Sequence, residues 1–176
     1  QLGYAEADPT LDVNGWDAAH KAILLATLAY GFTVDPDKVY VRGIERVRGP
    51  DIDFAKRLGF VVKLLCVVRE HPRGIVEIRT QPSFIPQSHI LSSVNGVFNA
   101  VAVRGDTAGD SLFYGRGAGK DPTASSVVAD IVEAALGLEH DGCHRGFLPY
   151  QMEGSVMSID DTETPYYVRF DVNDEP

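Results

Sequence analysis

The sequence predicts an α+β fold in which a mixed β-sheet is faced by helices. Apolar residues recur at helical spacing from Trp16 to Tyr30, which indicates a helix ahead of the sheet. From Phe60 to Tyr114 the chain consists of apolar and β-branched runs separated by Gly and Pro, a pattern typical of strands joined by short connections. A second helical segment, 122–136, follows these strands, so helices flank the sheet in sequence and can cover it.

The first helix is the most clearly delimited element. Asn14 precedes its apolar period and is expected to cap its N-terminus, while Gly31 is expected to end it. The segment before it, 3–14, is polar and turn-rich and contains an Asp-Pro step. We expect that segment to be an ordered loop.

Two further helices are predicted. The shorter is 51–58, with Asp51 near its start and Gly59 just past its end. The longer is 122–136, which begins on a proline and is expected to end at Gly137.

Five strands are predicted, four in the middle of the chain and one near its end. Their expected ranges are 60–69, 74–84, 96–103, 111–114 and 166–172. Turns between the middle strands are expected at the Gly and Pro clusters His71-Pro72-Arg73-Gly74, Gln81-Pro82, Ile85-Pro86 and Arg104-Gly105-Asp106.

Composition excludes several classes of protein. With 176 residues, of which 44% are hydrophobic and 23% charged, the chain has the size and balance of a globular domain. A net charge of -9 repels phosphate backbones, so no nucleic-acid partner is expected. No apolar run approaches the ~20 residues that span a bilayer, so no membrane partner is expected either. Two cysteines, Cys66 and Cys143, are too few for a disulfide framework and favour a cytoplasmic location.

A cluster of His140, Asp141, Cys143 and His144 could be interpreted as a metal site. It lacks a second ligand pair at zinc-site spacing and lies in a Gly-rich stretch, so we expect a solvated connection and no metal. Cys143 beside His144 could also be a nucleophile and its base. Adjacent residues seldom face each other, and no oxyanion element is evident, so we set this interpretation aside.

The carboxylates around the first helix are the most informative polar group. Asp17 and Lys21 are four residues apart and project from one face of the helix, where an isolated pair would be an ordinary surface ion pair. Glu6, Asp8 and Asp12 precede them on a path that can fold back toward the N-terminal end of the helix. The group is therefore either a solvated acidic loop or a site for a substrate that carries an ammonium group.

These carboxylates lie in a longer pattern that resembles the homoserine dehydrogenase signature. The pattern has a Gly-aromatic-small start, an Asp-Pro, an Asp-aliphatic-x-Gly-x-Asp and a Lys four residues later. Every fixed position is filled in Gly3-Tyr4-Ala5-Glu6-Ala7-Asp8-Pro9-Thr10-Leu11-Asp12-Val13-Asn14-Gly15-Trp16-Asp17-Ala18-Ala19-His20-Lys21. The resemblance continues in Glu77-Ile78-Arg79-Thr80-Gln81-Pro82, in Val94-Asn95-Gly96-Val97-Phe98-Asn99-Ala100, and from Gly115 to Ser125.

The resemblance implies an oxidoreductase that interconverts L-homoserine and L-aspartate 4-semialdehyde with NAD or NADP, in threonine, methionine and isoleucine biosynthesis. Lys21 would be the proton donor in reduction and the base in oxidation. Glu6 and Asp17 would bind the substrate, and Tyr4 and Asp12 would complete the pocket. This matches the chemistry of a substrate with an ammonium at one end and an aldehyde oxygen, which gains charge, at the other.

For the cofactor, the resemblance implies a close backbone approach at Gly119, with Gly117 behind it, and at Gly3. The run from Gly115 to Gly119 is neither a P-loop nor a Rossmann fingerprint by its spacing. Plain turn glycines are the alternative for these positions.

The resemblance also implies the domain organisation. Residues 1–150 would form a catalytic, substrate-binding and dimerisation domain of a homodimer, with helix 122–136 packed toward an absent nucleotide-binding domain. Residues 151–176 would be a linker and the first strand of a truncated ACT domain. The chain lacks an initiator Met, so we expect an excised piece that is inactive alone. The alternative is a non-catalytic small-molecule-binding or dimerisation module.

Overall fold

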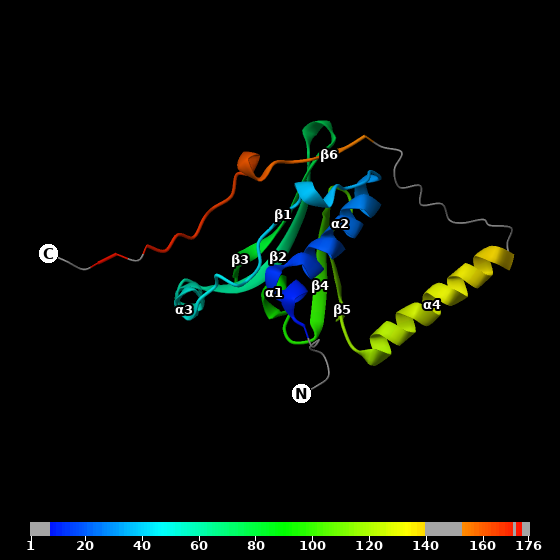
Figure 1. Ribbon diagram of the computed structural model, residues 1–176, viewed down its shortest axis with the longest axis horizontal. Helices are drawn as coiled ribbons and strands as arrows, with labels where there is room; N and C mark the ends of the chain where they lie inside the picture. The colour runs from blue at the N-terminus through cyan, green and yellow to red at the C-terminus, as the bar shows by residue number, and fades with distance from the viewer. Residues whose placement is uncertain (1–7, 140–152, 171, 174–176) are drawn as a thin grey trace. The chain divides into compact units, whose positions relative to one another are not determined.

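The structure is a computed structural model that describes residues 8–139, 153–170, 172 and 173. Its principal elements, shown in Figure 1, are α1 (Thr10–Asn14), α2 (Trp16–Tyr30), β1 (Tyr40–Val41), α3 (Gly49–Arg57), β2 (Phe60–His71), β3 (Ile75–Pro86), β4 (Phe98–Gly105), β5 (Gly109–Arg116), α4 (Lys120–Glu139) and β6 (Ser155–Val156). Short 3₁₀ turns occupy Pro36–Lys38, Pro72–Gly74, Ile90–Ser93 and Ile159–Asp161.

The chain divides into two compact units. One, here called the helix–sheet unit, comprises Leu11–Phe84 with the described residues of Pro149–Pro176. The other, here called the hairpin unit, comprises the described residues of Gln1–Thr10 and Ile85–Leu148.

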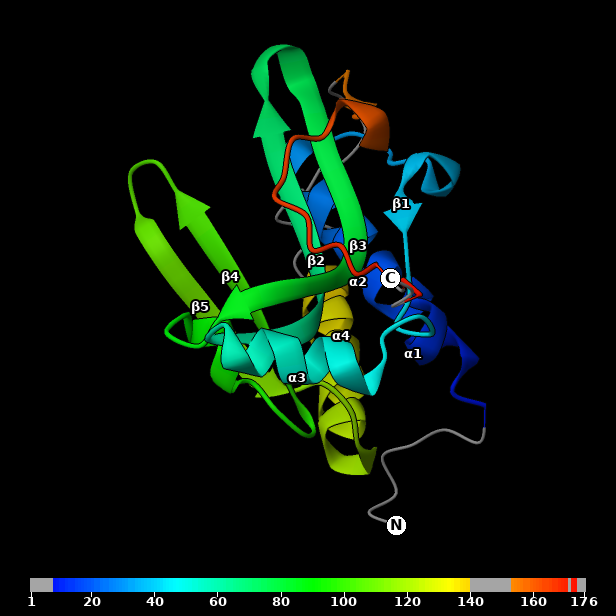
Figure 2. The ribbon, with the colours of Figure 1, turned by 90° about the vertical axis from the view of Figure 1, so that its left-hand side faces the viewer.

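The sheet of the helix–sheet unit is mixed, as predicted. Its strand order is β1-β3-β2, and β2 and β3 form a long hairpin through the turn Pro72–Gly74 (Figure 2). β1 runs parallel to β3, with Tyr40 opposite Arg79. β6 also runs parallel to β3, with Ser155 opposite Ile75. The middle strand β3 is paired on both sides, and its residues 76–80 are all buried.

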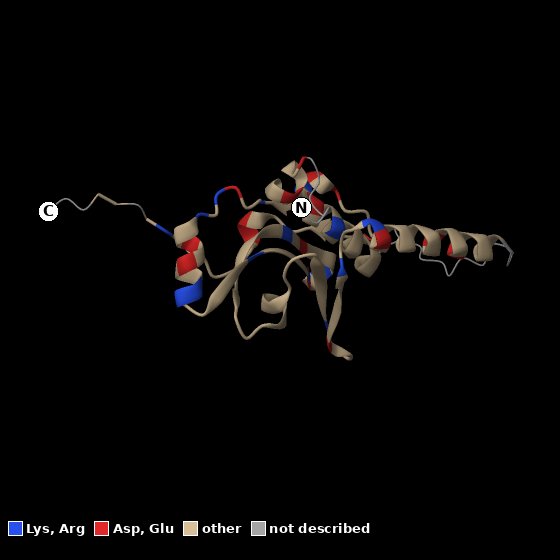
Figure 3. Ribbon diagram, turned by 90° about the horizontal axis from the view of Figure 1, so that it is seen from below, with Lys and Arg blue, Asp and Glu red and all other residues tan. Residues whose placement is uncertain are grey.

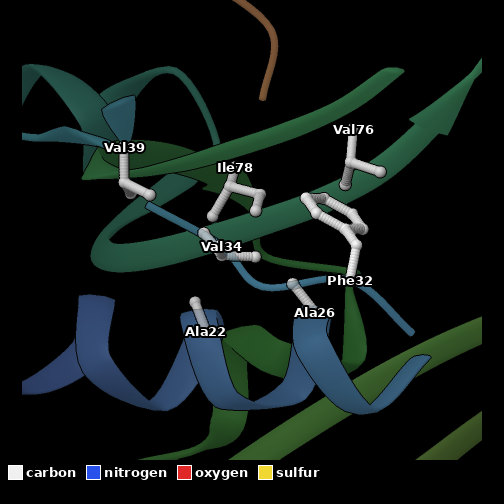
Figure 4. Close-up of a cluster of buried hydrophobic side chains, with 7 residues drawn as sticks. All are labelled: Ala22, Ala26, Phe32, Val34, Val39, Val76 and Ile78. Carbon is white, nitrogen blue, oxygen red and sulfur yellow. The ribbon is translucent and has the colours of Figure 1, made fainter. Parts of the chain in front are cut away.

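The core of this unit lies between α2 and β3. Figure 4 shows how α2 turns short side chains toward the sheet, where they meet larger apolar ones. The cluster consists of Ala22, Ala26, Phe32, Val34, Val39, Val76 and Ile78. Alanines at the contact let the helix approach the strand closely, and Ala26 is fully buried. Burying apolar surface in this way is the main stabilising contribution to the fold.

The termini of α2 are set by glycines in the left-handed region. Gly31, with φ of 69°, ends the helix and donates its N–H to the Thr27 carbonyl at 2.9 Å, which confirms the predicted C-cap. The predicted N-cap was wrong by one residue, because Gly15, with φ of 86°, occupies that position. The Asn14 side chain still accepts a hydrogen bond from the Trp16 N–H at 3.0 Å.

The hairpin unit contains a two-stranded antiparallel sheet and one long helix. β4 and β5 pair from Phe98↔Arg116 to Gly105↔Gly109, and the Phe98 and Tyr114 rings stack with centroids 4.9 Å apart. Almost every residue of this hairpin is exposed, as is most of α4. The turn predicted at 104–106 lies at 106–108, because β4 continues through Gly105.

Several predicted boundaries were wrong. Residues 10–14 form α1 instead of a loop, and α3 begins at Gly49 instead of Asp51. β3 continues through Pro82. β1 pairs only with Arg79 and Thr80 of β3, so the missing N–H of Pro82 breaks no hydrogen bond of that pair. α4 continues through Gly137, because one glycine costs a long helix only about 1 kcal/mol.

The strand predicted at 166–172 does not form in the described residues of that range. Tyr167 instead stacks on Phe84, with ring centroids 4.7 Å apart, and its hydroxyl donates to Asp51 at 3.0 Å. Arg169 donates to the same carboxylate at 2.5 Å. A strand needs a neighbour to satisfy its backbone, and this segment is held by its side chains on α3 and β3.

Candidate active site

The site is built on the corner where α1 meets α2. Gly15 turns the chain between the two helices, and the loop after β1 braces the turn, with the Ile44 N–H donating to the Val13 carbonyl at 2.8 Å. Gly43 is buried against this corner. A Cβ at Gly43 would lie 2.1 Å from the Val13 carbonyl oxygen and 2.5 Å from the Asn14 Cα. The corner therefore requires glycine at position 43 on steric grounds.

Asp17 and Lys21 lie on the first two turns of α2, as predicted. Their side chains form an ion pair between Asp17 Oδ2 and Lys21 Nζ, and both are about half exposed, at 48% and 51%. An ion pair this exposed adds little stability. Two charged side chains held together at an accessible position can instead bind a ligand or move a proton.

Asp12 lies in the helix–sheet unit with this pair, exposed on α1 one short turn before the corner. Asp8 precedes α1, and its carboxylate accepts hydrogen bonds from the Thr10 hydroxyl at 2.5 Å and the Thr10 N–H at 3.0 Å. These bonds lower the pKa of Asp8, the hydroxyl contributing most. Asp8 is therefore engaged locally at the start of α1, where a carboxylate stabilises the exposed N–H groups of the helix.

An open pocket of about 610 Å³ flanks the same corner. It is lined by Asn14, Trp16, Tyr40, Val41, Arg42, Gly43, Glu45 and Arg46. Neither Asp17 nor Lys21 lines it, although Trp16 stacks obliquely on His20 beside them, with ring centroids 5.6 Å apart.

The predicted site residues Gly3, Tyr4 and Glu6 lie outside the residues that the structure describes, as does the cluster His140, Asp141, Cys143 and His144. Within the described ranges, no group of three His, Cys, Asp or Glu side chains is arranged to hold a metal ion. None of the described helices is long and apolar enough to cross a membrane.

The two glycines predicted near the cofactor behave differently. Gly119 has φ of 122°, which favours glycine, and its carbonyl accepts the Thr123 N–H at 3.1 Å at the start of α4. Gly117 is packed against its own hairpin, since a Cβ there would lie 1.8 Å from Asn99 Nδ2. Asn99 is exposed, so its side chain can rotate away, and this contact does not by itself require glycine at 117. Both belong to the hairpin unit, whereas Asp17 and Lys21 belong to the helix–sheet unit.

Sequence reasoning missed the contacts that hold α2 in place. Gly43 was not singled out, because its contact with Val13 spans thirty residues and no local pattern indicates it. Cys66 was considered only for disulfide formation, yet its sulfur lies 3.2 Å from the carbonyl oxygen of Ala18, the residue after Asp17.

Comparison with known proteins places the chain in one family over most of its length. A family model described as homoserine dehydrogenase matches residues 1–132. The chain belongs to the homoserine dehydrogenase family. The homoserine dehydrogenase of Neisseria gonorrhoeae is 44% identical over 180 residues, which cover 99% of this chain and 41% of that protein. The chain thus spans about 41% of the length of this curated relative.

Solved homoserine dehydrogenase structures confirm the fold. That of Thiobacillus denitrificans superposes with a TM-score of 0.81 at 40% identity, covering 89% of this chain and 37% of that one. A hyperthermophilic archaeal homoserine dehydrogenase in complex with NADPH is 31% identical, with a TM-score of 0.59 over 74% of this chain and 36% of that one. The predicted mixed sheet with helices is the fold of this family.

Proposed function

We propose that this chain carries the substrate-binding and proton-transferring part of an enzyme that interconverts L-homoserine and L-aspartate 4-semialdehyde. The observation that carries the proposal is the Asp17–Lys21 pair on one face of α2, within a signature that the family model spans. An i,i+4 pair would be unremarkable alone. Its place at the corner of α1 and α2 makes it the candidate site.

Lys21 is the residue that moves a proton. In the oxidation of homoserine, its neutral amine takes the proton of the substrate hydroxyl as the carbon loses a hydride. In the reverse direction, its ammonium returns a proton to the oxygen that gains negative charge as the aldehyde is reduced. A positioned group of this kind contributes roughly 10²- to 10⁴-fold to the rate.

Asp17 has two roles in this proposal. Its ion pair with Nζ holds the lysine in one position, and its free lone pairs can accept from the α-ammonium of the substrate. Asp12, on the neighbouring helix, and Glu6 and Tyr4, which precede the described residues, complete the binding group. Carboxylates around an ammonium supply the electrostatic complement that such a substrate needs.

The cofactor is NAD or NADP, as the NADPH complex of the archaeal relative supports. When bound, it accepts the hydride from homoserine or returns it to the aldehyde. Gly119 fits a close backbone approach, since its positive φ is one that only glycine adopts without strain. The tight packing of Gly117 on Asn99 supports only an indirect role. Gly3 is proposed on the signature alone.

The proposed organisation follows the family. Residues 1–150 form a catalytic and dimerising part, residues 151–176 a linker with the start of a regulatory ACT domain, and α4 packs on a nucleotide-binding domain. Exposed apolar side chains on α4, among them Ile131 at 62%, support the last point. A homodimer in the reducing cytoplasm completes the proposal, and the free thiol of Cys66 is consistent with that compartment.

Substrate selectivity tests the proposal. The gene product that carries these residues is assayed for NAD(P)H formation with L-homoserine and with 4-hydroxybutanoate, the same alcohol with hydrogen in place of the ammonium group. We expect turnover with homoserine only. Asp17→Asn should raise the KM for homoserine, while Asp37→Asn, an exposed carboxylate in the turn 36–38, should leave it unchanged.

Equal turnover of the two alcohols would exclude carboxylate recognition of the ammonium. No homoserine-dependent reduction of either cofactor would favour the alternative of a non-catalytic binding module.

A further inference from the structure

A half-buried thiol links the sheet to the turn of α2 that carries the proposed catalytic pair. Cys66 lies in β2, and its Sγ is 3.2 Å from the carbonyl oxygen of Ala18 and 3.1 Å from the hydroxyl oxygen of Thr80. Thr80 lies in β3 and is completely buried. Two hydrogen bonds therefore link Thr80 in β3, Cys66 in β2 and Ala18 in α2.

The donors and acceptors of these hydrogen bonds follow from the groups that form them. The Ala18 carbonyl can only accept, so the single S–H proton of Cys66 points to it, and the Thr80 hydroxyl donates to sulfur. Burial raises the pKa of the Cys66 thiol, against smaller lowering effects from Thr80 and Lys21. The sulfur is therefore protonated near neutral pH and available as a donor.

Most of the contact between α2 and the sheet is apolar and lacks direction. The helix turns Ala19, Ala22 and Ala26 to the core, and methyl groups give close packing with little resistance to a small rotation or slide of the helix. A hydrogen bond depends on angle and distance. The bond to Ala18 therefore adds a directional restraint on the rotation of α2, at the turn between Asp17 and Lys21.

We propose that Cys66 is a positioning residue, which, with Thr80 behind it, holds the first turns of α2 so that Lys21 keeps the orientation needed for proton transfer. The inference rests on the proposed function of Lys21. Displacements of about 1 Å can cost on the order of 10²-fold in rate, so even a weak directional bond at this place can affect turnover.

The test compares Cys66→Ala, Cys66→Ser and Thr80→Val in the gene product that carries these residues. Cys66→Ala removes the donor and should lower kcat by about tenfold, below the loss that a full 1 Å misplacement can cause, with a smaller change in the KM for homoserine. Cys66→Ser restores a donor and should recover most of kcat. Thr80→Val keeps the side-chain shape and should lower kcat about threefold, the equivalent of one weak hydrogen bond.

Melting temperature and the pH profile of kcat separate positioning from stability. Positioning predicts that the profile of Cys66→Ala is displaced and that of Cys66→Ser is not. If Cys66→Ala lowers only the melting temperature, with kcat and its pH profile unchanged, or if Ser does no better than Ala, the inference is wrong. Should Cys66→Ala fail to fold, wild-type kcat in Thr80→Val would overturn it.

Lys21→Ala, measured alongside, separates this inference from the proposed function. Wild-type turnover in Lys21→Ala would reject the proposed function itself. A collapse of turnover in Lys21→Ala together with normal kcat in Cys66→Ala would reject only the role of Cys66.

Discussion

Glu77 and Arg79 project from the same side of β3 and form a buried ion pair, with Glu77 Oε1 2.5 Å from Arg79 Nε. Their side chains are only 4% and 9% exposed. The other carboxylate oxygen of Glu77 lies 3.2 Å from His71 Nε2. A single buried charge is costly, so each of these two charges is tolerated in the interior only because it is paired with the other.

Breaking this pair should destabilise the fold strongly. Glu77→Gln leaves the Arg79 charge buried without a counter-charge, and we expect a loss of about 3 kcal/mol in the free energy of unfolding. The double variant Glu77→Met/Arg79→Met replaces both charges by apolar groups and should recover most of that loss. Urea unfolding of the three proteins measures both values. A double variant no more stable than the single one would show that the pair is not the source of the effect.

The same carboxylate should make the fold sensitive to acid. Burial raises the pKa of Glu77, but the hydrogen bonds from Arg79 and His71, together with the charges of Arg79 and Arg69, outweigh it and hold the pKa below its ordinary value of 4.5. A carboxyl group whose pKa is lowered by folding stabilises the fold at pH values above its ordinary pKa. That contribution is lost as the pH falls through the lowered pKa. The stability gap between wild type and Glu77→Gln should therefore narrow below pH 4.5. A gap that stays constant down to pH 3 would contradict this.

The corner of α1 and α2 should not tolerate a side chain at position 43. A Cβ at Gly43 would meet backbone atoms of Val13 and Asn14, and such overpacking typically costs about 1–3 kcal/mol. Gly49→Ala is the matched control, because nothing lies within 4 Å of its Cβ position and alanine favours a helix. Thermal melting should show a clear loss for Gly43→Ala and none for Gly49→Ala. Equal melting temperatures would show that the loop is not packed on the corner as described.

The chain should associate in solution. Within the hairpin unit, Phe113 is 66% and Val103 46% exposed, and soluble monomers seldom expose extended apolar patches. A two-fold pairing would bury such a surface on both copies at once. Sedimentation velocity at low micromolar concentration should give a species near twice 19.2 kDa. Phe113→Glu should shift it to monomer. Lys56→Glu, in the last turn of α3, should not; Figure 3 shows Lys and Arg residues in blue at that end of α3.

The parts of the fold that sequence predicted are those with a local cause. The apolar period of α2 and its Gly31 C-cap lie within one stretch of chain, and both were confirmed. The strand expected at 166–172 has the right alternation, but the outcome depended on Asp51, more than a hundred residues away, which holds Tyr167 and Arg169. Alternation indicates a strand only where a neighbouring strand is available.

The candidate site divides in the same way. Asp17 and Lys21 were predicted to meet because helix geometry brings residues four apart together, and they do. The contact of Cys66 with Ala18 joins residues 48 apart, and that of Gly43 with Val13 depends on how the loop after β1 folds back. Neither leaves a periodic signal in the sequence, so the groups that support the site became evident only from the structure.

The central claim is that Lys21 transfers the proton, and its removal tests that claim most directly. The measurement is kcat for the gene product that carries these residues, in homoserine oxidation and in aldehyde reduction, for Lys21→Ala beside Lys56→Ala, an exposed lysine of α3. We predict a fall of roughly 10²- to 10⁴-fold in both directions for Lys21→Ala and no change for Lys56→Ala. Near wild-type turnover of Lys21→Ala in either direction would contradict the account.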